Sequence, residues 1–135
     1  LFSLFTFSFH NCKPTKVLPD KFTGIIIVYG SGGGFTGEWE MYYLLEDGNL
    51  FKKRSASEEF VYIKNVGKKA IKDVLGKFDE IPFKDIKFSH PGNMSYSIEF
   101  FSEDMRNKVI WGDFKYPPPE KLKALFEFLN SLNQL

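Results

Sequence analysis

Four stretches in the first half of the chain have residue patterns typical of β-strands. Residues 23–29 are rich in β-branched side chains, as expected of a buried strand. Residues 38–45 begin with alternating polar and apolar positions. In residues 60–64, Phe60, Tyr62 and Lys64 alternate with Val61 and Ile63, which suggests another strand. Residues 50–53 form the return strand of a hairpin with residues 38–45. Asp47-Gly48 lies between them and is a strong signal for a hairpin turn whose two central residues both have positive φ.

The second half of the chain combines two helical patterns with two further strands. In residues 68–81 the apolar positions recur at helical spacing, and Pro82 ends the helix. Residues 95–101 alternate like a strand, and residues 108–111 form a short strand after a charged loop. Three prolines at positions 117–119 open a last helix. Its apolar stripe consists of Leu122, Leu125, Phe126, Leu129 and Leu132.

The element order is therefore ββββαββα, which predicts an α+β domain. We expect an antiparallel sheet of about six strands with two helices packed on one face. A chain of 135 residues and 15.6 kDa is long enough for one domain with a single core. Aromatic residues make up 18% of it, and we expect most of the 16 phenylalanines to lie in that core.

The N-terminal stretch has a composition of its own. Residues 1–9 are all apolar or small hydroxyl residues. Such a run has the length of a signal-peptide core and is too short to span a bilayer. Soon after it comes Cys12, the only cysteine of the chain, so a disulfide framework is excluded. The alternative is an amphipathic strand, because Phe5, Phe7 and Phe9 alternate with small hydroxyl residues.

An apolar segment that ends at a lone cysteine resembles the signal sequence of a bacterial lipoprotein. The resemblance implies that residues 1–11 are a signal-peptide remnant and that Cys12 carries the lipid. Residues 12–22, which include two prolines and three lysines, then form the anchor and its tether, and residues 23–135 form a single α+β domain. We therefore expect a membrane partner, reached through the lipid anchor, and a location in the bacterial cell envelope, facing the periplasm or in the outer membrane.

A glycine-rich segment follows the first predicted strand. Gly32 to Gly37 satisfies the pattern G-x-G-x-x-G, but a strand pattern comes next instead of a helix, which argues against a dinucleotide site. Two interpretations remain. The segment is either a flexible hairpin connection or a loop that presents Phe35 to a partner. On the second interpretation the predicted binding residues are Gly32, Gly33, Gly34, Phe35, Thr36, Gly37 and Trp39.

Motifs for catalysis or metal binding are scarce in the sequence. His90 is the one histidine outside the N-terminal stretch, and in the segment that begins with it we expect a turn with Gly92 at positive φ. The sequence contains no H-E-x-x-H or C-x-x-C pattern and no D-x-D-x-D-G calcium loop. It therefore predicts no catalytic residue, no metal site and no cofactor. A small hydrolase that uses His90 or a pair of carboxylates is the alternative.

The charge balance argues against a nucleic-acid partner. The chain has 18 Lys and Arg against 17 Asp and Glu, a net charge of +1, so it carries no large field of one sign. Small basic clusters such as Lys52-Lys53-Arg54 are then expected on a solvated face.

The segment Gly33-Gly34-Phe35-Thr36-Gly37 lies between two predicted strands, and a mid-chain helix, two strands and a leucine-rich helix follow. This order, over residues 23–133, resembles the emfourin-type inhibitors of thermolysin-like metallopeptidases, which are small bacterial α+β proteins with a G-G-F-x-G segment near their start. The resemblance implies a metallopeptidase as the partner. The chain departs from that pattern in its N-terminal stretch, in the Asp47-Gly48 hairpin and in Trp111-Gly112-Asp113.

The favoured prediction is a lipid-anchored cell-envelope domain without catalytic activity that binds a protein or peptide partner. Inhibition of a peptidase is one form that such binding would take. The alternatives are a small hydrolase and a purely structural component of the envelope.

Overall fold

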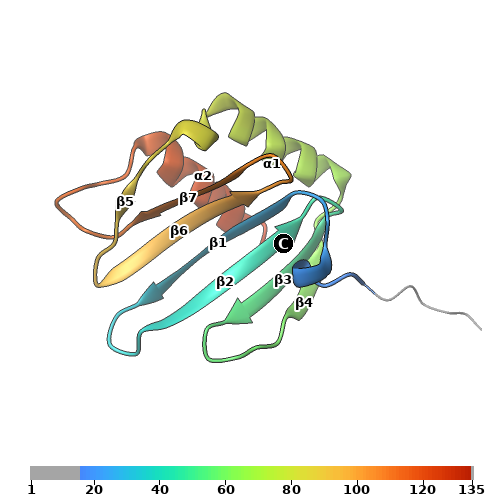
Figure 1. The fold of residues 1–135 in the computed structure, drawn as a ribbon, viewed down its shortest axis with the longest axis horizontal. Helices are drawn as coiled ribbons and strands as arrows, with labels where there is room; N and C mark the ends of the chain where they lie inside the picture. Colours follow the sequence, from blue (N-terminus) through green and yellow to red (C-terminus); the bar gives the residue numbers. More distant parts are fainter. Residues whose placement is uncertain (1–15, 135) are drawn as a thin grey trace, which may run out of the picture.

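A seven-stranded sheet with two α-helices on one face makes up the computed structural model, which describes residues 16–134 (Figure 1). The remaining positions, residues 1–15 and 135, lie outside the described part. In chain order the elements are the 3-10 turn η1 (Pro19–Lys21), strands β1 (Ile26–Gly33), β2 (Glu38–Leu45), β3 (Asn49–Arg54) and β4 (Val61–Asn65), helix α1 (Lys68–Glu80), the 3-10 turn η2 (Phe83–Asp85), strands β5 (Ser89–His90), β6 (Met94–Phe101) and β7 (Arg106–Trp111), and helix α2 (Glu120–Ser131).

The strand order in the sheet is β4-β3-β2-β1-β6-β7-β5. Neighbouring strands are antiparallel except β5, which runs parallel to β7. The predicted α+β class is confirmed, but the expectation of about six strands in a purely antiparallel sheet was wrong. The missed strand has only two residues, Ser89 and His90, and two residues are too few to show a period of alternation.

The core lies between the sheet and the two helices. From β1 it takes Ile27 and Tyr29, two positions that share a face because side chains alternate along a strand. The helical stripes that the sequence predicted meet this face. The buried positions of the helices are Ile71, Val74 and Phe78 of α1 and Leu122, Leu125 and Leu129 of α2. Both helices therefore cover the same side of the sheet (Figure 1).

The β2–β3 hairpin turns where the sequence predicted, but its geometry differs. Gly48 has a φ of 91°, whereas no non-glycine residue of the described part has a positive φ, so the expectation for Asp47 was wrong. The Gly48 N–H donates to the Leu45 carbonyl at 2.9 Å, and the Asn49 N–H donates to the Asp47 carboxylate at 2.9 Å. The aspartate thus closes the loop through its side chain, and a single glycine supplies the left-handed position.

Gly92 also differs from its prediction. Its φ is not positive, and His90 ends strand β5 instead of opening a turn. A side chain at Gly92 would collide with the backbone of Gly112, and one at Gly112 would collide with the carbonyl of Met94. These glycines are therefore required because two backbone segments approach each other closely, and not because a turn needs positive φ.

The segment before β1 packs on the face opposite the α-helices. Figure 1 shows η1 in front of the sheet, and Pro19 within it is buried. Part of the predicted tether thus lies against the domain, while Cys12 and the predicted signal-peptide remnant lie outside the described residues. Between residues 16 and 134, no helix is long and apolar enough to cross a membrane.

Candidate functional site

The predicted binding segment consists of a strand end and a tight turn. Gly32 and Gly33 belong to β1, which extends four residues beyond the predicted strand end at Tyr29, and Trp39 belongs to β2. The turn itself is residues 34–37. Glycine is needed here because Gly34 and Gly37 have φ values of 67° and 66°.

Hydrogen bonds fix both ends of this turn. The Gly34 N–H donates to the Asn93 carbonyl at 2.6 Å, and the Gly37 N–H donates to the Gly34 carbonyl at 3.3 Å. The Thr36 hydroxyl accepts from the Glu38 N–H at 3.3 Å. Phe35, at the tip, is fully exposed to solvent. The backbone is held while the ring projects outward, a geometry that suits a contact residue.

Trp39 supports the turn from the helix-free face of the sheet. Its ring lies over Gly32, its partner in the β1–β2 register, so a side chain at Gly32 would collide with it. The Trp39 N–H donates to the Ser55 hydroxyl, and the Ser55 N–H donates back to the Trp39 carbonyl, both at 2.8 Å. The half-buried indole therefore braces β1 beside the turn, and Gly32 serves as its platform.

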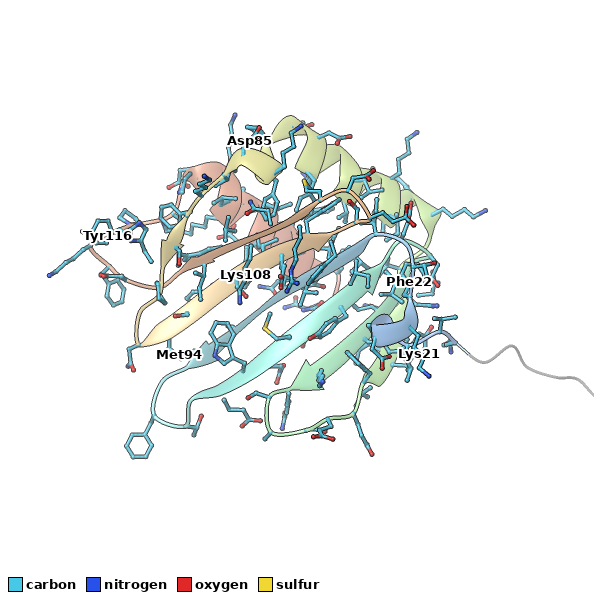
Figure 2. All side chains as sticks on the ribbon, viewed as in Figure 1. Lys21, Phe22, Asp85, Met94, Lys108 and Tyr116 are labelled. Atoms are coloured by element: carbon cyan, nitrogen blue, oxygen red, sulfur yellow. The ribbon has the colours of Figure 1, made fainter. Side chains whose placement is uncertain are left out.

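Three further exposed apolar side chains lie at the same end of the sheet as Phe35. Met94, at the start of β6, is the register partner of Gly33, and a side chain at Gly34 would lie 3.1 Å from its sulfur. The other two lie in the β7–α2 connection, at the left of Figure 2 with Met94. We call this group the loop patch; its members are Phe35, Met94, Phe114 and Tyr116.

The connection after β7 presents its aromatic residues on a turn of its own. The Asp113 carboxylate accepts from the Lys115 N–H at 2.9 Å, and the Asp113 carbonyl accepts from the Tyr116 N–H at 3.0 Å. Phe114, between them, is fully exposed. The sequence analysis did not identify Phe114 and Tyr116 as candidate binding residues. The sequence offered one signal for an exposed aromatic loop: the two residues lie between an aspartate, which favours turns, and a run of three prolines.

His90 is packed among aromatic rings. Its imidazole stacks on Tyr116 with centroids 4.2 Å apart and an interplanar angle of 12°, and it meets Phe88 edge-on at 4.9 Å. This contact ties the β7–α2 connection to β5. These ring contacts give His90 a structural role, because they hold Tyr116 of the loop patch in place.

A polar cleft of about 500 Å³ lies beside the turn, and Glu40 is its best-connected carboxylate. Its carboxylate is 3.0 Å from Lys52 Nζ and 3.4 Å from Arg54 Nε. The hydrogen bond from Lys52 is the main cause that holds the pKa of Glu40 below its ordinary value of 4.5. A general acid needs a raised pKa, so Glu40 is better suited to joining β2 to β3.

Tyr42 lines this cleft, and its ring stacks on that of the buried Tyr29 with centroids 5.6 Å apart. Burial raises the pKa of the Tyr29 phenol well above its ordinary range, and it raises that of Tyr42 as well. Tyr29 donates to the Asn133 side chain at 2.6 Å. Both phenols therefore stay protonated at neutral pH, and Tyr29 links the sheet to the end of α2.

Metal-ligating side chains do not gather in the described part of the chain, where no group of three or more His, Cys, Asp or Glu is placed to hold an ion. No protein-family model and no curated protein sequence matches this chain. The loop patch is therefore the feature of residues 16–134 that points most directly to a function.

Proposed function

We propose that this chain is a lipid-anchored domain of the bacterial cell envelope, without catalytic activity, that binds a protein or peptide partner through the β1–β2 turn. The observation that carries the proposal is the fully exposed Phe35 ring on a turn whose backbone is fixed at both ends. Exposed aromatic side chains on rigid supports are typical anchors of binding interfaces, because little conformational entropy is lost when they are buried.

The rest of the loop patch supports a binding surface larger than one side chain. Met94 adjoins the turn, and Phe114 and Tyr116 add aromatic area from an independent connection. The partner that the emfourin resemblance implies is a metallopeptidase. On this proposal the turn occupies the cleft of the enzyme, with Phe35 in a hydrophobic pocket, and the chain inhibits without reacting.

A hydrolase is the weaker proposal for this geometry. His90 is engaged in aromatic stacking, and Glu40 is held ionised by Lys52. A general base or acid needs a side chain poised near neutral pH and directed at a substrate. Binding needs only the exposed side chains of the loop patch.

The Phe35→Ala variant tests the proposed binding site. A pull-down from envelope extract with the soluble Cys12→Ser chain identifies the partner, and titration then measures its affinity. We expect Phe35→Ala to weaken binding by about 1–3 kcal/mol, roughly 5- to 150-fold, with an unchanged melting temperature. Val61→Ala, an exposed apolar residue outside the loop patch, is the matched control and should bind like the wild type. Unchanged affinity of Phe35→Ala would remove the turn from the binding site.

The anchor is tested separately, in cells, with a fatty-acid probe. We expect the probe to label the wild-type chain and not Cys12→Ser. Equal incorporation into both chains, or into neither, would contradict an anchor at Cys12.

A further inference from the structure

The exposed large apolar side chains of residues 16–134 fall into two groups at opposite ends of the sheet. Four of them form the loop patch. The other five lie in the chain just before η1 and in strand β4, two segments that Lys16 joins by its contact with the Tyr62 ring. We call this second group the edge patch; its members are Val17, Leu18, Val61, Tyr62 and Ile63, which are 37–57% exposed.

Two segments far apart in the sequence meet in the edge patch. Lys16 Nζ lies 3.6 Å from the centroid of the Tyr62 ring, so the chain before η1 runs beside β4. The buried Pro19 fixes η1 on the sheet immediately after Leu18. An apolar groove of about 470 Å³ between η1 and the sheet, lined in part by Phe22 and Phe60, continues this surface.

Strand β4 is the last strand of the sheet and pairs only with β3. Its outer edge therefore presents unpaired backbone N–H and C=O groups. Val61 and Tyr62 project beside this edge on opposite faces of the sheet, because side chains alternate along a strand. Soluble domains usually protect such an edge with charges, prolines or a covering segment, because an open apolar edge invites association. Five exposed apolar residues near this edge therefore indicate a surface that another molecule covers when the protein functions.

Lysines stand around the edge patch. Lys16 and Lys21 are exposed, and Lys53 lies with its ammonium 4.8 Å from the centroid of the Phe60 ring. Lysine side chains of this kind lay their methylene stems along apolar surface and direct the charge outward. Asp20 and Glu59 are also nearby in the chain, so the surface is mixed in charge and not strongly basic.

The covalent chain limits how far the edge patch can lie from a lipid on Cys12. Four residue steps separate Cys12 from Lys16, and a fully extended chain of that length spans at most about 14 Å. A domain held by that lipid therefore keeps Lys16, and with it Tyr62, near the bilayer surface.

We propose that the edge patch rests against the phospholipid bilayer that holds the anchor, with its apolar side chains at the headgroup boundary and Lys16 and Lys21 toward lipid phosphates. The inference rests on the proposed anchor at Cys12. Partial exposure of a row of apolar residues with lysines beside it suits interfacial contact. In this orientation the loop patch, at the other end of the sheet, faces away from the membrane and is open to a partner (Figure 1).

Hydrogen–deuterium exchange on the full chain tests this contact. Cys12 is joined through its thiol to a maleimide lipid, so that the tether exists whatever the cell does to this residue. The chain is then mixed with phosphatidylethanolamine and phosphatidylglycerol vesicles. We expect amide exchange in residues 61–65 to slow severalfold with vesicles and exchange in residues 34–37 to stay unchanged.

Paired variants make the result specific. Val61→Asp with Ile63→Asp should abolish the slowing in residues 61–65, whereas Phe35→Asp should leave it intact. Equal exchange with and without vesicles would overturn the proposal, as would equal slowing at both ends of the sheet. Slowing without vesicles that grows with protein concentration would also overturn it, because it would assign the edge to a second copy of the chain.

The two proposals are contradicted by different results. If Cys12 carries no lipid, fatty-acid labelling of Cys12 in cells is absent. If the edge patch does not contact the bilayer, amide exchange in residues 61–65 of the chemically lipidated chain is unchanged by vesicles, and this result does not depend on cellular processing.

Discussion

The loop patch and the edge patch are both apolar, but they differ in composition and in presentation: the loop patch is mostly aromatic, and the edge patch is mostly aliphatic. In the loop patch, Phe35 and Phe114 stand on turns whose backbone is fixed by local hydrogen bonds, and both rings are fully exposed. In the edge patch, Val61 and Ile63 lie in an edge strand whose register to β3 shifts between Leu50 and Phe51, and both are only partly exposed. The difference lies in the backbone that carries the side chains and in how far each side chain projects.

That difference determines what each patch can recognise. An isolated ring on a rigid turn enters a pocket and is surrounded there, which gives specificity. A row of half-exposed side chains along a strand cannot enter a pocket, but it can lie on a broad surface. The aromatic loop patch thus suits the proposed protein partner, and the aliphatic edge patch suits the proposed contact with a bilayer.

The largest expected effect on stability comes from Gly32, whose missing side chain makes room for the Trp39 ring beside the β1–β2 turn. A valine at Gly32 would place its Cβ 2.6 Å from the Trp39 Cα and inside the indole contact. We expect Gly32→Val to lower the free energy of unfolding by about 1–3 kcal/mol, measured by denaturant titration. Val61→Ser, in the edge patch, should stay within about 0.5 kcal/mol of wild type. Equal losses of stability in the two variants would show that close packing at Gly32 does not distinguish the loop patch from the edge patch.

A second comparison asks whether Phe35 and Phe114 contact one partner surface. Phe114→Ala should weaken partner binding by about 1–3 kcal/mol, as expected for Phe35→Ala, without loss of stability. The double variant should lose the sum of the two single effects to within about 0.5 kcal/mol, because the two side chains stand on separate turns and contribute independently. No effect of Phe114→Ala on affinity would restrict the binding site to the β1–β2 turn.

A smaller effect separates support from contact inside the loop patch. Tyr116→Ala removes the stacking on His90 and should cost about 0.5–1.5 kcal/mol of stability. The matched variant Phe114→Ala should leave the melting temperature unchanged, since its ring is fully exposed. Comparable losses in thermal denaturation would mean that Phe114 also has a packing role.

The smallest expected effect concerns the charged cleft beside the turn. Because the pKa of Glu40 is lowered by folding, its ionised form stabilises the fold above the ordinary value of 4.5, and this contribution is lost as pH falls through the lowered pKa. Glu40→Gln should therefore cost about 0.5 kcal/mol at neutral pH, a small amount because exposed ion pairs are screened. Denaturation at a series of pH values should show wild type and variant converging in acid. A difference that persists in acid would assign the effect to packing.

Much of the fold was predictable because its elements are long and strongly periodic. The stripes of Ile71, Val74 and Phe78 in α1 and of Leu122, Leu125 and Leu129 in α2 each extend over about two turns at helical spacing, so their period is clear. Strand β5 has two residues and depends on hydrogen bonds to β7, which no local pattern encodes. The φ of Asp47 was mispredicted because its side chain can close the loop without a left-handed backbone.

The candidate site was predictable only where glycine marked it. Phe35 was identified because glycines surround it, and glycine signals a turn. Phe114 and Tyr116 are exposed because of the path of the β7–α2 connection, which is a tertiary property. The edge patch was not predicted at all, since an apolar run such as residues 60–63 is also typical of a buried strand and the sheet order alone puts β4 at the edge.

The close approach of Gly92 and Gly112 has a consequence for engineering this chain. Where these two main-chain segments touch, there is no room for a side chain larger than hydrogen. Positions 92 and 112 should therefore tolerate only glycine. Phe35 and Phe114, at the tips of the two turns, have no such restriction because they are fully exposed. A library that randomises positions 35 and 114 while keeping Tyr116 and the glycines at 32, 34, 37, 92 and 112 should retain its fold in most clones, and the domain would serve as a scaffold for new specificities.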